Sequence, residues 1–353
     1  MGNLAAQRKG SNTRSWAEHR WHAGEVNLYP PEQRLFDREL DRLIREYALV
    51  GYAPSAPVLS GTDTVVTLGS CFARELRTFL RNAGLPAGRL AIPAGLNNTY
   101  ALLDFVSWCV TGEETQQAFR YDRLETGEIE EWKPEEERAG YHDLFAEAGA
   151  FVFTFGLAEV WQDRETGGVF WRGVPDSIFD SDRHVFRLTT VEENAENIRR
   201  IVELVRRINP DAAIVLTLSP VPLKATFREV ACLSADCVSK SVLRVALDQV
   251  TSDGLPGVYY WPSFEIVKWA GPHMPWPAYG FDDGVPRHVT RYIVSSIVDA
   301  FVEAFYPPDV VADMRRRHRG KGSIPGRPDT LPARLEAARG RRRKSRSKTS
   351  AGD

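Results

Sequence analysis

Short apolar segments alternate with amphipathic ones between residues 64 and 305, and this alternation constrains the fold more than any other feature. The apolar segments are typical of strands buried on both faces, because polar and apolar residues do not alternate within them; they cover residues 64–68, 151–155, 212–218 and 258–261. Helices are expected between them, at residues 72–84, 99–110, 191–208, 236–249 and 289–305. The pattern predicts an α/β fold, a three-layer α/β/α sandwich with a central parallel sheet.

The rest of the chain divides into flanking segments. Residues 1–50 are expected to form an N-terminal extension with one helical stretch at 31–47, and residues 51–308 to form the α/β domain. Within that domain, residues 113–140 and 161–186 are predicted excursions, the second one rich in hairpins. Residues 309–353 are basic and poor in large apolar side chains, which predicts a disordered tail. The run at 341–344 is typical of an arm that contacts nucleic acid or an anionic surface, although a solvated terminus is the more common explanation.

Composition narrows the class of protein. With 43% hydrophobic and 26% charged residues and a net charge of −2, the chain is expected to be soluble and to have no general affinity for nucleic acid or membranes. No stretch is typical of a signal peptide or a membrane span. The four cysteines show no CxxC spacing, which argues against a zinc site and against a disulfide scaffold. We therefore expect a cytoplasmic protein without a metal or cofactor, whose oligomeric state the sequence does not indicate.

The turn Gly69-Ser70-Cys71-Phe72-Ala73 joins the first predicted strand to the first helix. Active sites in parallel sheets form at such carboxyl ends of strands. The free N–H groups and the positive end of the following helix stabilise a thiolate or a developing oxyanion, so Ser70 or Cys71 is a candidate nucleophile. The alternative is that Ser70 caps the helix and Cys71 packs as a small apolar side chain.

His288 is the candidate base. It lies immediately before the last predicted helix, with Asp282 and Asp283 a few residues upstream. A histidine in a late loop, close to carboxylates, matches a base that is oriented by an acid. The alternative is a loop histidine that faces solvent.

Further residues are candidates for the site. Asn97 and Asn98 precede a helix, where either one could cap it or donate an amide to an oxyanion. Gly156 lies at the end of the second strand, and Glu159 and Trp161 after it could contact substrate, or could anchor the excursion. Lys240 could bind an anion, but a surface ion pair is the interpretation that we favour for it.

With these segments in order, the chain resembles the GSCFA family, which is named for the residues at 69–73. Further blocks resemble those of the family: Ala94-Gly95-Leu96-Asn97-Asn98-Thr99-Tyr100, Phe155-Gly156-Leu157-Ala158-Glu159-Val160-Trp161, Asn209-Pro210, Leu218-Ser219-Pro220-Val221-Pro222-Leu223, Ser239-Lys240-Ser241-Val242-Leu243-Arg244 and Tyr260-Trp261-Pro262-Ser263-Phe264-Glu265-Ile266-Val267. GSCFA proteins in turn resemble the SGNH/GDSL esterases and acyltransferases. That resemblance implies a flavodoxin-like fold, a nucleophile after the first strand and a late Asp-x-x-His motif.

The chain departs from that larger group at three positions. The resemblance places Cys71, not Ser70, at the position of the nucleophile. Ala158 stands where the larger group has an oxyanion-binding asparagine, so Asn97 or Asn98 would have to replace that donor. Asp283 lies five residues before His288 rather than three, and Asp282 one further, so either carboxylate could orient the base.

The resemblance implies that the protein hydrolyses or transfers acyl groups on a carbohydrate or similar alcohol. Cys71 or Ser70 would attack the ester, with His288 as base and Asp283 or Asp282 as its acid. The partner would then be a small-molecule or glycan acyl ester. The alternative is a catalytically inactive binding or scaffold protein on the same fold, because a fold does not fix a function.

Overall fold

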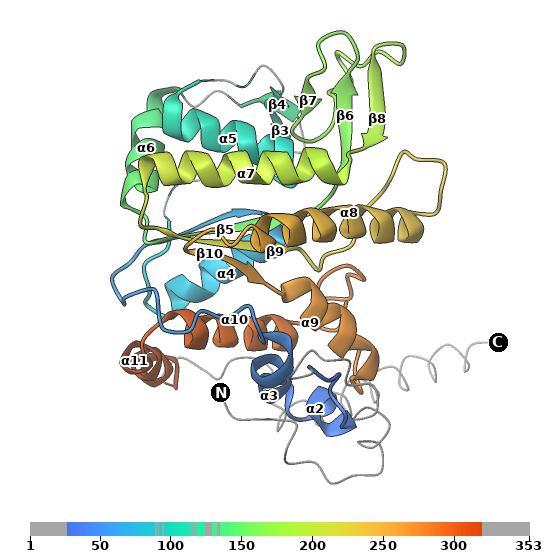
Figure 1. Ribbon diagram of the computed structural model, residues 1–353. Coiled ribbons are helices and arrows are strands. Elements are labelled where there is room, and N and C mark those ends of the chain that lie inside the picture. The colour runs from blue at the N-terminus through green and yellow to red at the C-terminus, as the bar shows by residue number, and fades with distance from the viewer. Residues whose placement is uncertain are drawn as a thin grey trace, which may run out of the picture.

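A central parallel sheet organises the computed structural model, which describes residues 27–319 except 89, 91, 94, 114, 116–117, 124–128 and 133–134. Its strands lie in the order β1 (Val65–Gly69), β5 (Ala150–Phe155), β9 (Ala213–Leu218) and β10 (Val258–Trp261), as Figure 1 shows. All three pairings are parallel. These strands confirm the segments predicted from the apolar pattern.

The strand order indicates at which end of the sheet a ligand site is expected. A parallel bridge joins Val65 to Ala87 on the side of β1 opposite to β5. After β1 the chain therefore first pairs on that side and then crosses to form β5 on the other. The resulting order is that of a flavodoxin-like sheet, and it reverses between β1 and β5. Ligands bind outside the carboxyl ends of the strands at such a reversal. Gly69 and Phe155 end the two strands there.

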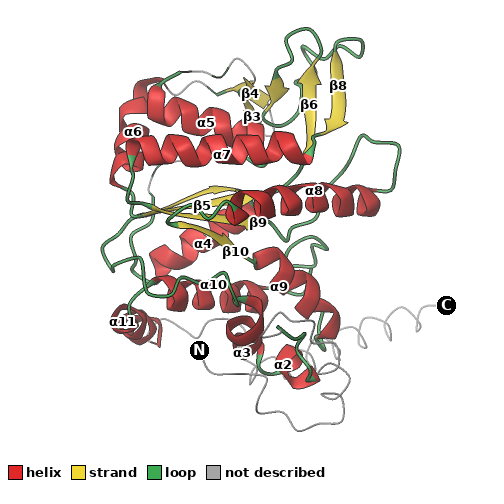
Figure 2. Cartoon of the chain, viewed as in Figure 1, coloured by secondary structure: helices red, strands yellow, loops and turns green. Residues whose placement is uncertain are grey.

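Alternate residues of each strand face two separate apolar cores. In β5, Phe151 and Phe153 face one core while Val152 faces the other. Helices α5 (Thr99–Thr111), α6 (Arg138–Glu147), α7 (Val191–Ile208) and α8 (Cys232–Ser252) pack on the first face. Helices α4 (Cys71–Asn82), α9 (Ser263–Ala270) and α10 (Arg291–Phe305) pack on the second. The three-layer sandwich predicted from the sequence is therefore confirmed (Figure 2).

Segments from both ends of the described chain join the second core. Helices α2 (Gln33–Asp37) and α3 (Leu40–Leu43) and a π-helix (Ile44–Ala48) contribute buried leucines and isoleucine to it, within the stretch predicted to be helical. Helix α11 (Pro308–Arg319) contributes Val311 and Met314, so the first residues of the predicted tail are helical. Residues 320–353, including the basic run at 341–344, lie outside the described residues. Among the helices of residues 27–319, none is both long and apolar enough to cross a membrane.

The predicted excursions form a small second sheet above α5 and α7 in Figure 1. Its strands are β2 (Ala118–Phe119), β7 (Val169–Phe170), β6 (Glu159–Asp163) and β8 (His184–Leu188), in that order. A hairpin of β3 (Tyr121–Arg123) and β4 (Ile129–Glu131) and a 3₁₀ turn (Glu135–Glu137) complete the region.

One buried carboxylate ties this second sheet to the sandwich. Asp104 of α5 is fully buried and forms an ion pair with Arg120 at 2.7 Å. It also accepts hydrogen bonds from the hydroxyl of Thr115 at 2.7 Å and from the indole N–H of Trp171 at 3.1 Å. A buried carboxylate is tolerated where its charge is paired and hydrogen-bonded in this way.

Gly69 is required where β1 turns into α4. Its φ is +104°, which L side chains rarely adopt, and a Cβ at this position would lie 2.0 Å from the carbonyl oxygen of Thr154. Since that oxygen belongs to the backbone of β5, no side-chain rotation can relieve the contact. Glycine therefore permits the close approach of β1 and β5 at their carboxyl ends.

An alanine in the left-handed region costs about 2 kcal/mol on its own. We expect Gly69→Ala to lower the free energy of unfolding by more than this, because the added Cβ also meets the backbone of β5. The measurement is denaturant unfolding followed by circular dichroism.

The matched control is Gly167→Ala. Gly167 also has a positive φ, +74°, but a Cβ added to it would have no other atom within 4 Å. This variant should lose only about 1–2 kcal/mol. Equal losses in the two variants would show that the approach of Thr154 is not what requires Gly69.

Candidate active site

Ser70 and Cys71 begin α4 at the carboxyl end of β1. Ser70 is buried, and its hydroxyl accepts the N–H of Phe72 at 3.3 Å, so Ser70 is the N-cap of the helix. Its own amide donates to the carbonyl of Thr154 at 3.2 Å, which fixes the turn against β5. Cys71 is the first residue of α4, at the positive end of the helix. The side chain of Cys71 lies outside the described part of the structure.

The turn after β5 is held against Asn97. The amides of Gly156 and Leu157 both donate to the carbonyl oxygen of Asn97, at 2.8 and 3.1 Å. A Cβ on Gly156 would lie 3.2 Å from that oxygen and 3.5 Å from the Cβ of Asn97. Two of the predicted site residues, Asn97 and Gly156, are therefore in direct contact at the reversal of strand order.

Asn98 has a structural position instead. It is buried and caps α5, since its Oδ1 accepts the N–H of Ala101 at 2.8 Å. Its Nδ2 donates to the carbonyl of Trp171 at 3.0 Å. Both ends of this amide are therefore engaged within the protein.

Lys240 lies inside the protein, and the expectation of a surface ion pair was wrong. Its side chain is buried on α8, and Nζ donates to the carbonyl of Gly156 at 2.6 Å. The neighbouring Ser239 accepts the N–H of Ala158 at 2.8 Å. The helical spacing of Asp236, Lys240 and Leu243, all buried, carries the signal that could have shown that this face turns inward.

Burial also changes the chemistry of Lys240. Desolvation disfavours the charged ammonium and lowers its pKa to about 8. The nearby carboxylate of Asp236 opposes this change, while the positive charge of Arg287 adds to it. Lys240 therefore holds the turn at Gly156 with a hydrogen bond whose donor is easily deprotonated.

His288 and Asp283 form the pair that the sequence predicted from their positions. The Nδ1 of His288 lies 2.6 Å from Oδ2 of Asp283, and Oδ1 of Asp283 accepts the N–H of Val285 at 2.9 Å. Because of this turn, the carboxylate of Asp283 reaches the imidazole of His288 although the two residues are five positions apart. The hydrogen bond with His288 is the main reason that the pKa of Asp283 lies below its usual value.

Asp282 has a different partner. Its Oδ2 accepts the N–H of Arg291 at 2.7 Å, at the first residue of α10. The carboxylate thus satisfies one of the free amides at that end of the helix. Of the two candidate acids, Asp283 is the one that contacts His288.

The loop that carries His288 is fixed to the segment after β9. The hydroxyl of Tyr279 donates to the carbonyl of Pro220 at 2.9 Å, and Nε of Arg287 donates to that of Pro222 at 3.0 Å. Because β9 pairs directly with β5, this segment leaves the sheet beside the turn at Gly156. The loop of His288 is therefore held at the carboxyl edge of the sheet, where the nucleophile candidates also lie.

Glu159 is the first residue of β6, and its side chain is only 2% exposed. Oε1 lies 3.3 Å from Nη1 of Arg228, whereas Oε2 is buried with no hydrogen-bond partner among the described residues. Sequence reasoning missed Arg228, which comes from the irregular segment between β9 and α8. A buried carboxylate oxygen without a donor is costly, which makes Glu159 a candidate for contact with a ligand.

The model of the GSCFA family matches residues 64–301, from β1 into α10. The chain belongs to the GSCFA family. The match spans Ser70, Asn97, Gly156, Lys240 and His288. A comparison with curated proteins found no match.

Solved structures similar to the GSCFA chain are esterases and lipases. A GDSL-like lipase from Parabacteroides merdae is 12% identical, with a TM-score of 0.39, and the match covers 70% of this chain and 98% of the lipase. A carbohydrate esterase family 3 protein from Talaromyces cellulolyticus is 10% identical with a TM-score of 0.33, covering 72% and 99%. A family 2 carbohydrate esterase from Clostridium thermocellum, in complex with cellohexaose, is 13% identical with a TM-score of 0.32, covering 71% and 65%.

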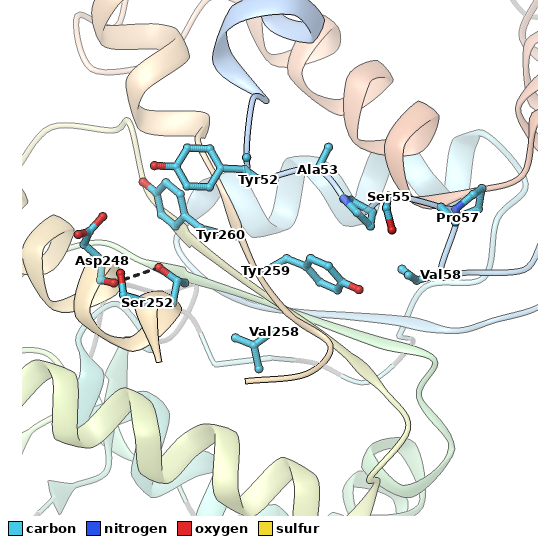
Figure 3. Close-up of a pocket in the computed structure, with 14 residues that line it drawn as sticks. Tyr52, Ala53, Ser55, Pro57, Val58, Asp248, Ser252, Val258, Tyr259 and Tyr260 are labelled. Carbon is cyan, nitrogen blue, oxygen red and sulfur yellow. Dashed lines mark hydrogen bonds between the residues drawn. The ribbon is translucent and has the colours of Figure 1, made fainter. Parts of the chain in front are cut away.

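A hollow of about 630 Å³ lies away from these residues (Figure 3). It is lined by residues 51–58, by the C-terminal turns of α8 and by Val258, Tyr259 and Tyr260 of β10. Helix α8 ends there, and the chain enters β10 there, so the hollow is on the amino side of the sheet. Two of its tyrosine hydroxyls are bound to residues outside the lining: that of Tyr52 accepts from Arg244, and that of Tyr260 donates to Glu265. It is separate from the candidate active site.

The low pKa of Lys240 predicts a pH dependence of stability. In the unfolded chain the ammonium regains its ordinary pKa near 10.5, so between about pH 8 and that value the unfolded state binds a proton that the folded state has lost. Raising the pH through this window therefore favours folding. We expect the free energy of unfolding of the wild type to rise relative to Lys240→Met, by at most about 3 kcal/mol. Denaturant titrations at several pH values measure it.

The control is Lys224→Met, because Lys224 is exposed. The difference in free energy of unfolding between this variant and the wild type should not change between pH 8 and 10. A flat difference for Lys240→Met as well would mean that Lys240 is not buried as described.

Proposed function

We propose that this GSCFA protein is an acyl-ester hydrolase or O-acyltransferase acting on a carbohydrate or similar alcohol. The observation that carries the proposal is the 2.6 Å contact between His288 and Asp283, in a loop fixed at the carboxyl edge of the sheet. A carboxylate bound to one ring nitrogen holds the imidazole in one tautomer and stabilises its protonated form. Such a pair has the chemistry of a general base.

Cys71 is the proposed nucleophile, in preference to Ser70. The hydroxyl of Ser70 is occupied as the cap of α4, whereas Cys71 begins the helix. A helix N-terminus stabilises a thiolate and lowers the pKa of a thiol placed there. The family resemblance assigns the same position to Cys71. With Nδ1 of His288 bound to Asp283, Nε2 is the nitrogen that would accept the proton of the thiol.

The reaction has two balanced steps. The sulfur of Cys71 forms a bond to the acyl carbon while His288 takes the thiol proton, and the ester C–O bond then breaks as His288 returns that proton to the departing alcohol. In the second step His288 deprotonates water or another alcohol, whose oxygen attacks the thioester and releases the thiol. Water gives hydrolysis, and a second alcohol gives acyl transfer.

The oxyanion of this reaction would be held by the backbone N–H of Cys71 and the side chain of Asn97. The amides of Phe72 and Ala73 at the start of α4 are bound to Ser70. The backbone amides of Gly156, Leu157 and Ala158, in the turn after β5, also donate hydrogen bonds within the protein. Asn97, in contact with Gly156, would then supply the amide that Ala158 lacks.

His288→Ala should reduce hydrolysis of a short aryl ester by about 10²–10⁴-fold, the usual contribution of a general base. Asp283→Asn should reduce it less, because the imidazole remains. The measurement is kcat/KM for 4-nitrophenyl acetate with the purified full chain. The control is His142→Ala, an exposed histidine on α6 that should leave the rate unchanged. Full activity in His288→Ala would overturn the proposal in favour of a binding protein on this fold.

Separate variants identify the nucleophile. Cys71→Ala should abolish turnover and also remove the labelling by a thiol-directed acyl probe that peptide mapping finds at residues 70–71 of the native protein. Ser70→Ala should lose about 1 kcal/mol of stability through the missing cap but keep labelling. Labelling that survives in Cys71→Ala and disappears in Ser70→Ala would reverse the assignment.

A further inference from the structure

A cluster of aromatic side chains lies over the middle of the β6–β8 pair in the second sheet. Trp161 of β6 and Phe186 of β8 are directly opposite each other, with ring centroids 5.3 Å apart. Phe179 and Phe227 pack edge-on against Trp161, at 5.5 and 5.0 Å. We call these four residues the aromatic cluster. Phe227 comes from the segment between β9 and α8, so this segment reaches the second sheet, at the right of Figure 1.

The aromatic cluster is open to solvent. Phe227 is 68% exposed and Phe179 is 46% exposed. Aromatic rings gathered in this way remove large apolar areas from water when a ligand covers them, which is a reason to expect one.

A charged pair lies at the edge of the cluster. Glu159 stands two residues before Trp161 and therefore on the same face of β6. Arg228 directly follows Phe227 and approaches Oε1 of Glu159 to 3.3 Å, while it remains 29% exposed. Oε2 of Glu159 is buried without a donor among the described residues. At the edge of the cluster, Oε2 of Glu159 is therefore an acceptor without a donor, and the guanidinium of Arg228 is a partly exposed donor.

We propose that the aromatic cluster, with Glu159 and Arg228, binds a neutral sugar ring as the alcohol part of the ester; this inference rests on the proposed function. A pyranose presents C–H groups on its face, which cover aromatic rings, and hydroxyl groups at its rim. A rim hydroxyl donates to Oε2 of Glu159 and another accepts from Arg228. A sugar ring therefore supplies a partner for the rings and for both polar groups together.

The same contacts disfavour the other two candidate ligands. An anionic ligand such as a phosphate would meet the unpaired carboxylate oxygen of Glu159. A long acyl chain would cover the rings but would leave that oxygen buried and without a donor, at a cost in free energy. A sugar hydroxyl removes this cost.

The sugar site is within reach of the proposed nucleophile. Glu159 follows Gly156 by three residues, so their Cα atoms are at most about 11 Å apart. Gly156 in turn follows β5, whose Thr154 is bound to Ser70. A sugar on the aromatic cluster would therefore present an esterified hydroxyl toward the carboxyl edge of the sheet.

The test is direct binding without catalysis. The full chain is screened against an array of neutral oligosaccharides, and the strongest binder is titrated by calorimetry. We expect binding that Phe227→Ala and Glu159→Gln each weaken at least about tenfold, and that Phe227→Trp retains, since tryptophan supplies the same stacking surface. Trp269→Ala removes an aromatic side chain that is 60% exposed on α9, outside the cluster, and should leave the affinity unchanged.

Activity on two aryl esters separates the possible outcomes. Phe227→Ala should keep its kcat/KM for 4-nitrophenyl acetate, which carries no sugar, within about twofold. If no oligosaccharide binds, or if Phe227→Ala instead loses only activity on 4-nitrophenyl octanoate, the cluster is not a sugar site. If oligosaccharides bind in the predicted way while His288→Ala keeps full esterase activity, the sugar site stands and the proposed function fails.

Discussion

The close pairing of β1 and β5 at their carboxyl ends is the contact on which the site depends. Gly69 lets the two backbones approach, and the amide of Ser70 then binds the carbonyl of Thr154. This single junction sets where α4 begins. It also sets where the chain leaves β5, and so where Gly156 meets Asn97 and Lys240. Backbone contacts between β1 and β5 thus position both the start of α4, which carries the candidate nucleophile, and the turn at Gly156.

The main elements could be predicted because their signals are local. The strands of the central sheet and the helix at Val191–Ile208 follow from apolar pattern and caps alone, such as the capping box formed by Thr190 and Glu193. The second sheet could not be drawn in this way. Its strands β2 and β7 have two residues each, and their partners come from distant parts of the chain. Short pairings between distant segments leave no periodicity in a sequence.

The site was predictable to a similar degree. His288 and Asp283 could be named from their place before the last helix, but only the turn at Val285 shows how a five-residue separation still brings them together. Lys240 was assigned to the surface because lysine usually lies there, although its helical neighbours point inward. Arg228 was missed because the segment that carries it has no regular structure, and its partner Glu159 lies far away in the sequence.

The buried carboxylate of Asp104 has a consequence for how such a chain can diversify. The second sheet is fastened to the sandwich through this side chain and its donors Thr115, Arg120 and Trp171, and also through the ion pair of Arg187 with Glu193. Trp161 and Phe186 of the aromatic cluster lie on strands of this sheet, whereas His288 and α4 belong to the sandwich. Insertions or exchanges in the second sheet can therefore alter which molecule is recognised while the reacting groups keep their places. Under the proposed function, most of the recognition surface therefore lies on a part of the fold that can change while the part that carries the reacting groups is kept.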